Sequence, residues 1–267
     1  MQELHNKIKS ILENGSASLF IAYQKSREGK ITPTFITKPE QSQKAYFGDD
    51  CKQNLAVYIH KQEVKNFGKV GIFANIYTLK SLLQIYAENQ IRDDYLKVVT
   101  INPNGAIVEF ANFMEIENYV NENKPAPNPE DMERVEKLSN LSREERWDYW
   151  LNELSTCIKC YACRAACPMC YCTKCTVDCN QPQWISTPSH SLGNIEWHIM
   201  RAMHLAGRCV ECNECARVCP MDIPLNLLTV KLNDTANIEF GQQAGLKGEL
   251  DYALSTFKVD DKENFIR

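Results

Sequence analysis

The cysteines in the second half of the chain constrain it more than any other feature. The chain has 13 cysteines in 267 residues, and all except Cys51 lie between Cys157 and Cys219. Eight of them form two copies of the spacing C-x2-C-x2-C-x3-C-P, which are Cys157, Cys160, Cys163 and Cys167 in the first run and Cys209, Cys212, Cys215 and Cys219 in the second. Such local clustering indicates metal ligation rather than disulfides between distant segments.

This spacing is typical of bacterial ferredoxins with two 4Fe–4S clusters, in which the fourth cysteine of each run ligates the other cluster. We therefore predict two clusters with crossed ligands. Cluster 1 is expected on Cys157, Cys160, Cys163 and Cys219, and cluster 2 on Cys209, Cys212, Cys215 and Cys167. One C-x-x-C pair would suit zinc or a redox dithiol, but two complete runs, each closed by Cys-Pro, favour the clusters.

Four further cysteines lie between the runs with the spacing C-x-C-x2-C-x3-C, and they are Cys170, Cys172, Cys175 and Cys179. Three interpretations are open: a third 4Fe–4S cluster, a tetrahedral zinc ion, or metal-free thiols that shield the first cluster. Four crowded thiolates need a cation, which favours a metal. A third cluster could be inserted by the same cellular machinery that inserts the other two. Against this, the short C-x-C spacing suits zinc better than a 4Fe–4S cluster.

Composition excludes some classes of function. A net charge of −4 argues against a nucleic-acid surface. No apolar run reaches the length of a membrane span, and the first residues lack the apolar segment of a signal peptide. We therefore expect a cytoplasmic protein with no membrane span. Cys51 stands apart from the other cysteines and is predicted to be structural.

Residues 1–124 are predicted to form an α/β domain. Leu4, Ile8, Ile11 and Leu12 are spaced for an amphipathic helix that ends at Asn14-Gly15. Apolar runs predict strands at 19–23, 34–36, 69–74 and 97–101, with a helix over 77–89, whereas 55–59 fits a helix or a strand. The strand–helix–strand order over 69–101 favours a parallel pair. No glycine-rich phosphate loop follows Ile72, so a Rossmann-type nucleotide site is not supported.

The predicted fold class is α+β, with a second, mostly helical domain of the dicluster ferredoxin type over 125–240 and a tail over 241–267. Alternating prolines in 121–131 predict an extended linker between the domains. Ser142 and Glu145 fit a capping box at the start of a helix that leads into Cys157. Further helices are expected at 194–206, before the second run, and at 225–232 after it. The tail is expected to lie across the surface or to bind a partner.

Histidines and arginines lie near the two runs in the sequence. His190, His198 and His204 are predicted to be packing or surface residues rather than ligands. Cations near the runs would offset the negative charge of thiolate-ligated clusters, or would meet an acidic partner, and they are Arg164, Arg201, Arg208 and Arg217.

Several motifs carry a family resemblance. The segment from Cys157 to Cys163, followed by Cys167-Pro168-Met169-Cys170-Tyr171-Cys172, resembles iron–sulfur electron-transfer subunits related to the beta subunits of formate dehydrogenases and deazaflavin-reducing hydrogenases. Gly207 to Cys212, with Ile223-Pro224-Leu225, is similar to dicluster subunits of heterodisulfide-reductase-type and anaerobic sulfite-reductase-type complexes. Relatives often have Gly-Cys-Asp where this chain has Phe73-Ala74-Asn75, which implies that its N-terminal domain is a scaffold that has lost a cofactor.

The resemblance implies an electron-transfer subunit of an anaerobic oxidoreductase complex. Its partners would be other redox subunits, such as a flavoprotein, a hydrogenase, a formate dehydrogenase or a heterodisulfide-reductase-like protein. No catalytic residue is expected on this chain, because the substrate site would lie in another subunit. The alternatives are a self-contained oxidoreductase with flavin in the N-terminal domain, and a zinc-bound interaction module.

Overall fold

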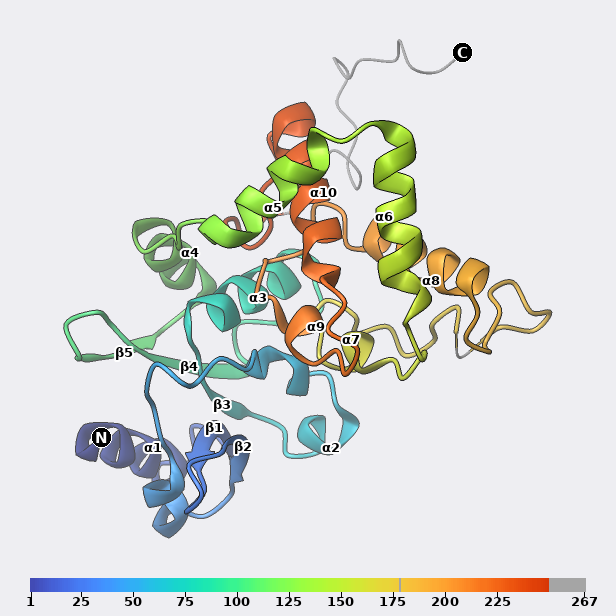
Figure 1. The fold of residues 1–267 in the computed structure, drawn as a ribbon. Helices are drawn as coiled ribbons and strands as arrows, with labels where there is room; N and C mark the ends of the chain where they lie inside the picture. Colours follow the sequence, from blue (N-terminus) through green and yellow to red (C-terminus); the bar gives the residue numbers. More distant parts are fainter. Residues whose placement is uncertain (178, 250–267) are drawn as a thin grey trace.

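The computed structural model describes residues 1–177 and 179–249 of the chain. An N-terminal five-stranded sheet with helices is followed by a mostly helical C-terminal part (Figure 1). This arrangement of helices with one sheet agrees with the predicted α+β class. The part of the predicted tail that follows residue 249 lies outside the described residues.

The sheet has the strand order β2-β1-β3-β4-β5. Its central strands β1, β3 and β4 are parallel, whereas β2 and β5 pair antiparallel at the two edges. The predicted strand–helix–strand unit is therefore confirmed, with α3 as the connection between β3 and β4. The strands are β1 Leu19–Lys25, β2 Ile31–Ile36, β3 Val70–Phe73, β4 Leu96–Ile101 and β5 Ile107–Phe110.

Asparagine side chains fix the start of several N-terminal helices. Asn75 accepts a hydrogen bond from the Thr78 amide at the start of α3, and Asn112 caps α4 in the same way. The ambiguous 55–59 segment is a short 3-10 helix whose first turn is capped by Asn54. The helices of this part are α1 Gln2–Glu13, η1 Pro39–Lys44, η2 Leu55–Tyr58, α2 Gln62–Lys65, α3 Ile76–Ala87 and α4 Phe113–Glu122.

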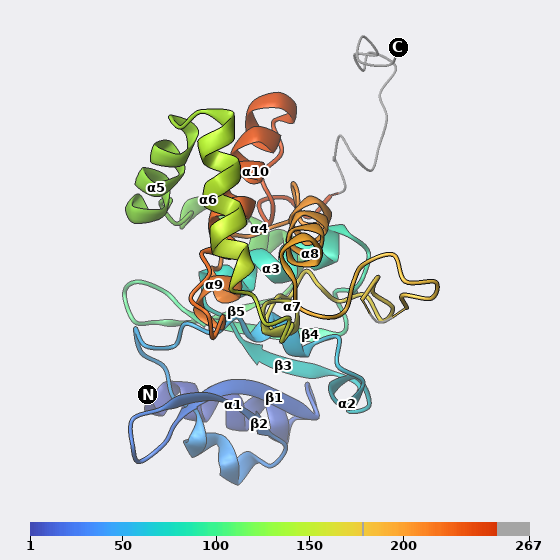
Figure 2. The ribbon, with the colours of Figure 1, turned by 45° about the vertical axis from the view of Figure 1, so that its right-hand side comes forward.

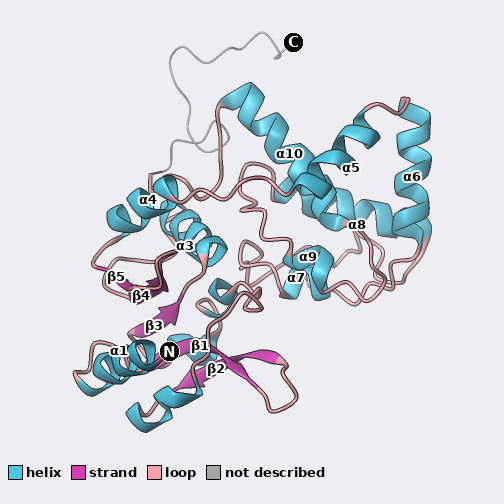
Figure 3. Cartoon of the chain, turned by 60° about the vertical axis from the view of Figure 1, so that its left-hand side comes forward, coloured by secondary structure: helices cyan, strands magenta, loops and turns pink. Residues whose placement is uncertain are grey.

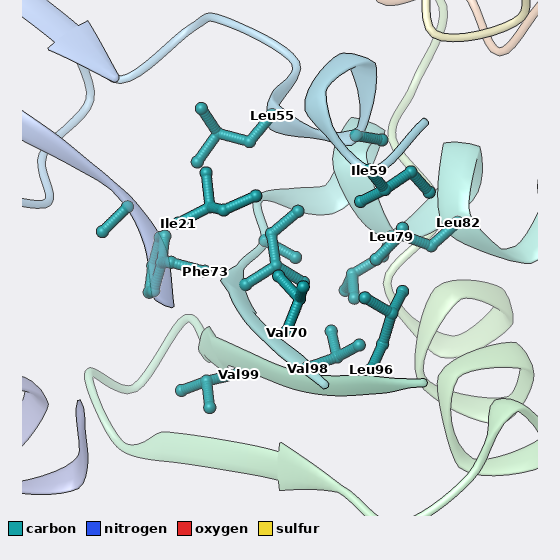
Figure 4. Close-up of a cluster of buried hydrophobic side chains, with 14 of the residues drawn as sticks. Ile21, Leu55, Ile59, Val70, Phe73, Leu79, Leu82, Leu96, Val98 and Val99 are labelled. Carbon is teal, nitrogen blue, oxygen red and sulfur yellow. The ribbon is translucent and has the colours of Figure 1, made fainter. Parts of the chain in front are cut away.

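The core of the N-terminal part lies between the sheet and α3. Figure 4 shows Leu79 and Leu82 of α3 against Val70 and Leu96 of the neighbouring strands. Helices α3 and α4 stand between the sheet and the C-terminal helices (Figures 1 and 2). One face of this domain is therefore turned toward the cysteine runs.

Four longer helices build the C-terminal part, and two short ones carry the runs. Helix α6 packs on α8, and α10 packs on α5, α8 and α9. The short helices α7 and α9 lie between the longer helices and the sheet domain (Figure 3). The helices are α5 Pro129–Ser139, α6 Arg143–Ser155, α7 Ala162–Ala165, α8 Ser191–His204, α9 Glu214–Arg217 and α10 Leu225–Phe240.

The proline-rich linker is shorter than predicted. Residues 121–122 belong to α4, and α5 begins at Pro129, so only 123–128 are non-helical. Proline is tolerated at the first helical position because no amide is needed there, and Asn128 caps this turn. The helix predicted over 225–232 is also too short, because α10 continues to a left-handed Gly241. The capping box of Ser142 and Glu145 is confirmed.

A glycine in β3 makes room for an aromatic ring in β1. Gly71 pairs with Phe20, and a Cβ atom at Gly71 would come within 2.2 Å of the Phe20 ring. We expect Gly71→Ala to lower the free energy of unfolding by about 1–3 kcal/mol, because the fully buried ring cannot move aside. Thermal unfolding of the cluster-loaded protein would measure the effect.

The matched control is the same substitution in a Phe20→Leu background. There Gly71→Ala should cost clearly less, because the smaller side chain leaves room for the added methyl group. Equal costs in the two backgrounds would mean that the ring is not the cause.

Candidate metal centre

The two cysteine runs follow the same backbone path. In the first run Lys159 and Tyr161 have left-handed backbone angles, with φ of 53° and 56°. In the second run the equivalent Glu211 and Asn213 have φ of 62° and 58°. Each such non-glycine residue costs roughly 1–2 kcal/mol. The repetition of this strained path in both runs indicates that it serves the site that the cysteines form.

The left-handed turns direct backbone amides at sulfur. The amide of Lys159 lies 3.4 Å from the Sγ of Cys157, and Glu211 makes the equivalent contact with Cys209. Both runs close alike, since the amide of each fourth cysteine donates to the carbonyl three residues before it. Amide donors to sulfur stabilise thiolates, as cluster ligation requires.

Three cysteines of the first run share one small cavity with the last cysteine of the second. This cavity is lined by Cys157, Cys160, Cys163 and Cys219, with Tyr161, Trp197 and His198 around them. Cys219 interacts electrostatically with Cys157. The structure thus brings together the four residues that the spacing predicts for cluster 1.

The remaining four predicted ligands also lie together. Cys167, from the first run, interacts electrostatically with Cys209, Cys212 and Cys215 of the second. Helices α7 and α9 pack against each other, which places the two runs face to face. Each fourth cysteine therefore lies with the other run.

Burial makes several of these thiols hard to ionise without a cation. Burial, together with the negative charges of Cys215 and Cys167, raises the pKa of Cys209 to about 12. Burial likewise raises the pKa values of Cys163 and Cys215. Metal ligation requires thiolates, so binding would release protons and stabilise the fold. Two groups of four thiols with amide donors therefore fit the iron–sulfur clusters that the spacing predicts.

The N-terminal domain contributes contacts that the sequence did not reveal. Lys80 of α3 is buried and its Nζ donates to the carbonyl of Val210, 3.2 Å away, inside the second run. The buried side chain of Asn54 hydrogen-bonds to the Cys212 thiol. Lys80 and Val210 are 130 positions apart, so no local pattern could have indicated that they meet.

A hydrogen-bonded ion pair also joins α3 to the segment before the second run. The Nε of Arg208 lies 2.7 Å from one carboxylate oxygen of Glu88, and Tyr171 donates to the other oxygen. Burial would raise the pKa of Glu88, but the charge and hydrogen bonds of Arg208 hold it below its usual value. The group ties the Cys170–Cys172 segment and Cys209 to the sheet domain.

The cations and histidines near the runs have different environments. Arg208 and Arg217 form ion pairs, with Glu88 and Glu214, whereas Arg201 is buried among cysteines. His190 is exposed and caps α8, and His204 is also exposed. His198 is buried beside the first cavity and its Nε2 has no hydrogen-bond partner.

The four extra cysteines have unlike surroundings. Cys170 is partly buried against the N-terminal core and hydrogen-bonds with Cys167, which lowers the pKa of Cys167. Cys172 and Cys179 are exposed, and Cys175 is half-buried. Among the residues that the structure describes, no three His, Cys, Asp or Glu side chains converge as ligands of a single metal ion. This holds for the eight cysteines of the two runs as well as for the four extra cysteines, so all three centres stay predictions.

A family model of the 4Fe-4S dicluster domain matches residues 170–224. The matched segment holds the four extra cysteines and the whole second run, and it begins after Cys167. It supports iron–sulfur electron transfer in this part of the chain. The match does not include the first run, whose Cys163 and Cys167 interact electrostatically with Cys215 of the second run.

The helices in the described part of the chain do not combine the length and apolar character needed to cross a membrane.

We expect the Glu88–Arg208 pair to hold the two parts of the chain together. Glu88→Gln or Arg208→Met should each lower the free energy of unfolding by about 1–3 kcal/mol, because each leaves a partly buried charge unpaired. At pH 7 the pair contributes in full, since the folded-state pKa of Glu88 is depressed and its contribution is lost only as the pH falls through that value.

The double variant is the control in this thermal-unfolding series. It should be more stable than the sum of the two single losses predicts, because it leaves no charge without a partner. Strictly additive losses would contradict a direct interaction.

Proposed function

We propose that this chain is an electron-transfer protein that holds two 4Fe–4S clusters and exchanges single electrons with other redox proteins. The crossing of the two runs carries the proposal, because each group of four thiols takes its fourth member from the other run. The dicluster family match over residues 170–224 supports the same chemistry. The clusters, when bound, supply one-electron redox chemistry at low potential.

The cysteine ligands would divide between the two clusters in the same way as the cavity lining and the electrostatic interactions group them. Cys157, Cys160, Cys163 and Cys219 would hold cluster 1, and Cys209, Cys212, Cys215 and Cys167 would hold cluster 2. The backbone amides of Lys159 and Glu211 would donate to ligand sulfur in the two sites. Such donors, with burial and nearby charge, set the reduction potentials.

Cluster 1 would be the point of contact with a redox partner. Cys160 is exposed, and the neighbouring side chains of Ile158 and Met221 are 56% and 41% exposed. Exposed apolar side chains beside a ligand give a partner protein a surface on which to dock close to the cluster. The partners that the resemblance suggests are flavoprotein, hydrogenase, formate dehydrogenase or heterodisulfide-reductase-like subunits of an anaerobic complex.

The N-terminal domain would serve as a scaffold. It contacts the second run through Asn54 and Lys80, and its Glu88 binds Tyr171, after the first run, and Arg208, before the second. These contacts give the domain a structural task that needs no cofactor of its own. Cys170, Cys172, Cys175 and Cys179 would form an additional centre, as a third 4Fe–4S cluster or a zinc site.

Metal content tests this function directly. Protein purified without oxygen should contain about eight irons and eight sulfides per chain, and its broad visible absorption should bleach on reduction with dithionite. About twelve irons would indicate the third cluster, and eight irons with one zinc would indicate the zinc site. Zinc without iron or sulfide would refute electron transfer, and released flavin would support the self-contained oxidoreductase instead.

Paired substitutions test the crossed ligands. If they cross, Cys157→Ala with Cys219→Ala removes ligands from one cluster, and about four irons of the pair should remain. Cys157→Ala with Cys167→Ala removes a ligand from each cluster, and both should be lost. The two double variants remove equal numbers of thiols and so control for each other. Runs that each hold their own cluster would give the opposite iron counts.

A further inference from the structure

Arg201 of α8 lies between the two cysteine runs. Its side chain is 5% exposed, and its Nη2 donates to the carbonyl of Cys163, 3.1 Å away, in the first run. The guanidinium also hydrogen-bonds to the thiols of Cys170 and Cys215. Its Nε atom is buried and has no hydrogen-bond partner among the described residues. One cation thus contacts both runs and keeps an unused donor.

The charge of Arg201 is balanced differently from that of its neighbours. Four other cations beside the runs have a carboxylate among their partners, in the pairs Lys80–Glu211, Lys159–Glu196, Arg208–Glu88 and Arg217–Glu214. Among the described residues, the guanidinium of Arg201 instead hydrogen-bonds to sulfur, at the thiols of Cys215 and Cys170.

A buried guanidinium needs compensating negative charge. The thiol of Cys215, a predicted ligand of cluster 2, hydrogen-bonds to this guanidinium. The second thiol partner, Cys170, is itself hydrogen-bonded to the cluster 2 ligand Cys167. The contact with the cluster 1 ligand Cys163 is made through its backbone carbonyl. The position of Arg201 therefore favours negative charge at cluster 2 over cluster 1.

We propose that Arg201 is the fixed countercharge of the cluster on Cys209, Cys212, Cys215 and Cys167, and that it makes this cluster the first to accept an electron. This inference rests on the proposed two-cluster function. An added electron increases the negative charge of the cluster, which a neighbouring cation stabilises. Water at the exposed Cys160 favours reduction of cluster 1, but a charge inside the protein acts through a lower dielectric constant and so has the larger effect.

Reduction potentials test the role of Arg201. The anaerobically purified protein is titrated with dithionite as the one-electron reductant, and the two cluster signals are followed by electron paramagnetic resonance. We expect Arg201→Met to lower the higher of the two midpoint potentials more than the lower one. Arg201→Lys, which keeps the charge, should restore most of the shift. Lys231→Met removes an exposed charge on α10 and should leave both potentials unchanged.

A ligand substitution assigns each potential to its cluster. Cys160→Ser alters an exposed predicted ligand of cluster 1, so it should move the lower potential and spare the higher one. The inference is overturned if Arg201→Met moves the lower potential more, if it moves neither, or if Cys160→Ser moves the higher one.

Loss of iron is also decisive. If the Arg201→Met variant does not retain cluster 2, the Arg201→Lys variant should retain the iron of that cluster. A lysine variant that also lacks this iron would show that the positive charge of Arg201 is not what the cluster requires. Wild-type protein without iron would refute the proposed function itself. Wild-type protein with both clusters and an unshifted variant would refute only the role of Arg201.

Discussion

Negative charge on sulfur is the constraint on which the C-terminal half of this protein depends. Eight cysteines stand in two groups, and burial opposes the ionisation of several of them. Thiolates can be buried only if cations, amide donors or metal ions compensate their charge. Two unit charges about 5 Å apart interact by roughly 3 kcal/mol at an effective dielectric constant near 20. One well-placed cation therefore contributes about as much as one fully buried apolar side chain, roughly 1.5–3 kcal/mol.

The same constraint explains the buried polar residues on the helix of the sheet domain that faces the second run. Its helix α3 faces the second run, and Lys80, Ser81 and Gln84 on that helix are buried polar residues. Lys80 reaches the run directly, and Ser81 accepts a hydrogen bond from Asn54, which also contacts Cys212. Gln84 accepts the amide of Gly245 and so fixes the returning chain over α3. The polar residues of α3 thus serve the neighbouring domain, while Leu79 and Leu82 serve its own core.

The fold was predictable where local signals agree. The apolar spacing of α1, the strand–helix–strand unit and the capping box at Ser142 all correspond to elements of the structure. The prolines of 121–131 do not reveal the start of α5 at Pro129, because proline occurs both in extended linkers and in the first turn of a helix. The 55–59 segment could not be assigned from periodicity, because a single 3-10 turn is too short to show one.

The cysteine spacing predicts which residues are ligands, but not the residues that surround them. Repeated cysteine spacing names the predicted ligands, but it does not show that Asn54 and Lys80 contact the second run. Nor does it show that Arg201, within the described residues, hydrogen-bonds to thiols rather than to a carboxylate. Those relations depend on the packing of α3 and α8, and residues far apart in the sequence determine that packing. The left-handed angles at Lys159, Tyr161, Glu211 and Asn213 were equally hidden, because none of these residues is glycine.

The exchange of the fourth cysteines couples the maturation of the two sites. Neither run can complete its own centre, so a partly loaded chain already presents the last ligand of the vacant site. Filling one centre fixes the separation of α7 and α9 and so shapes the other. Deletion of either whole run would therefore remove ligands from both centres, whereas loss of the ligands of one centre leaves the ligand set of the other complete.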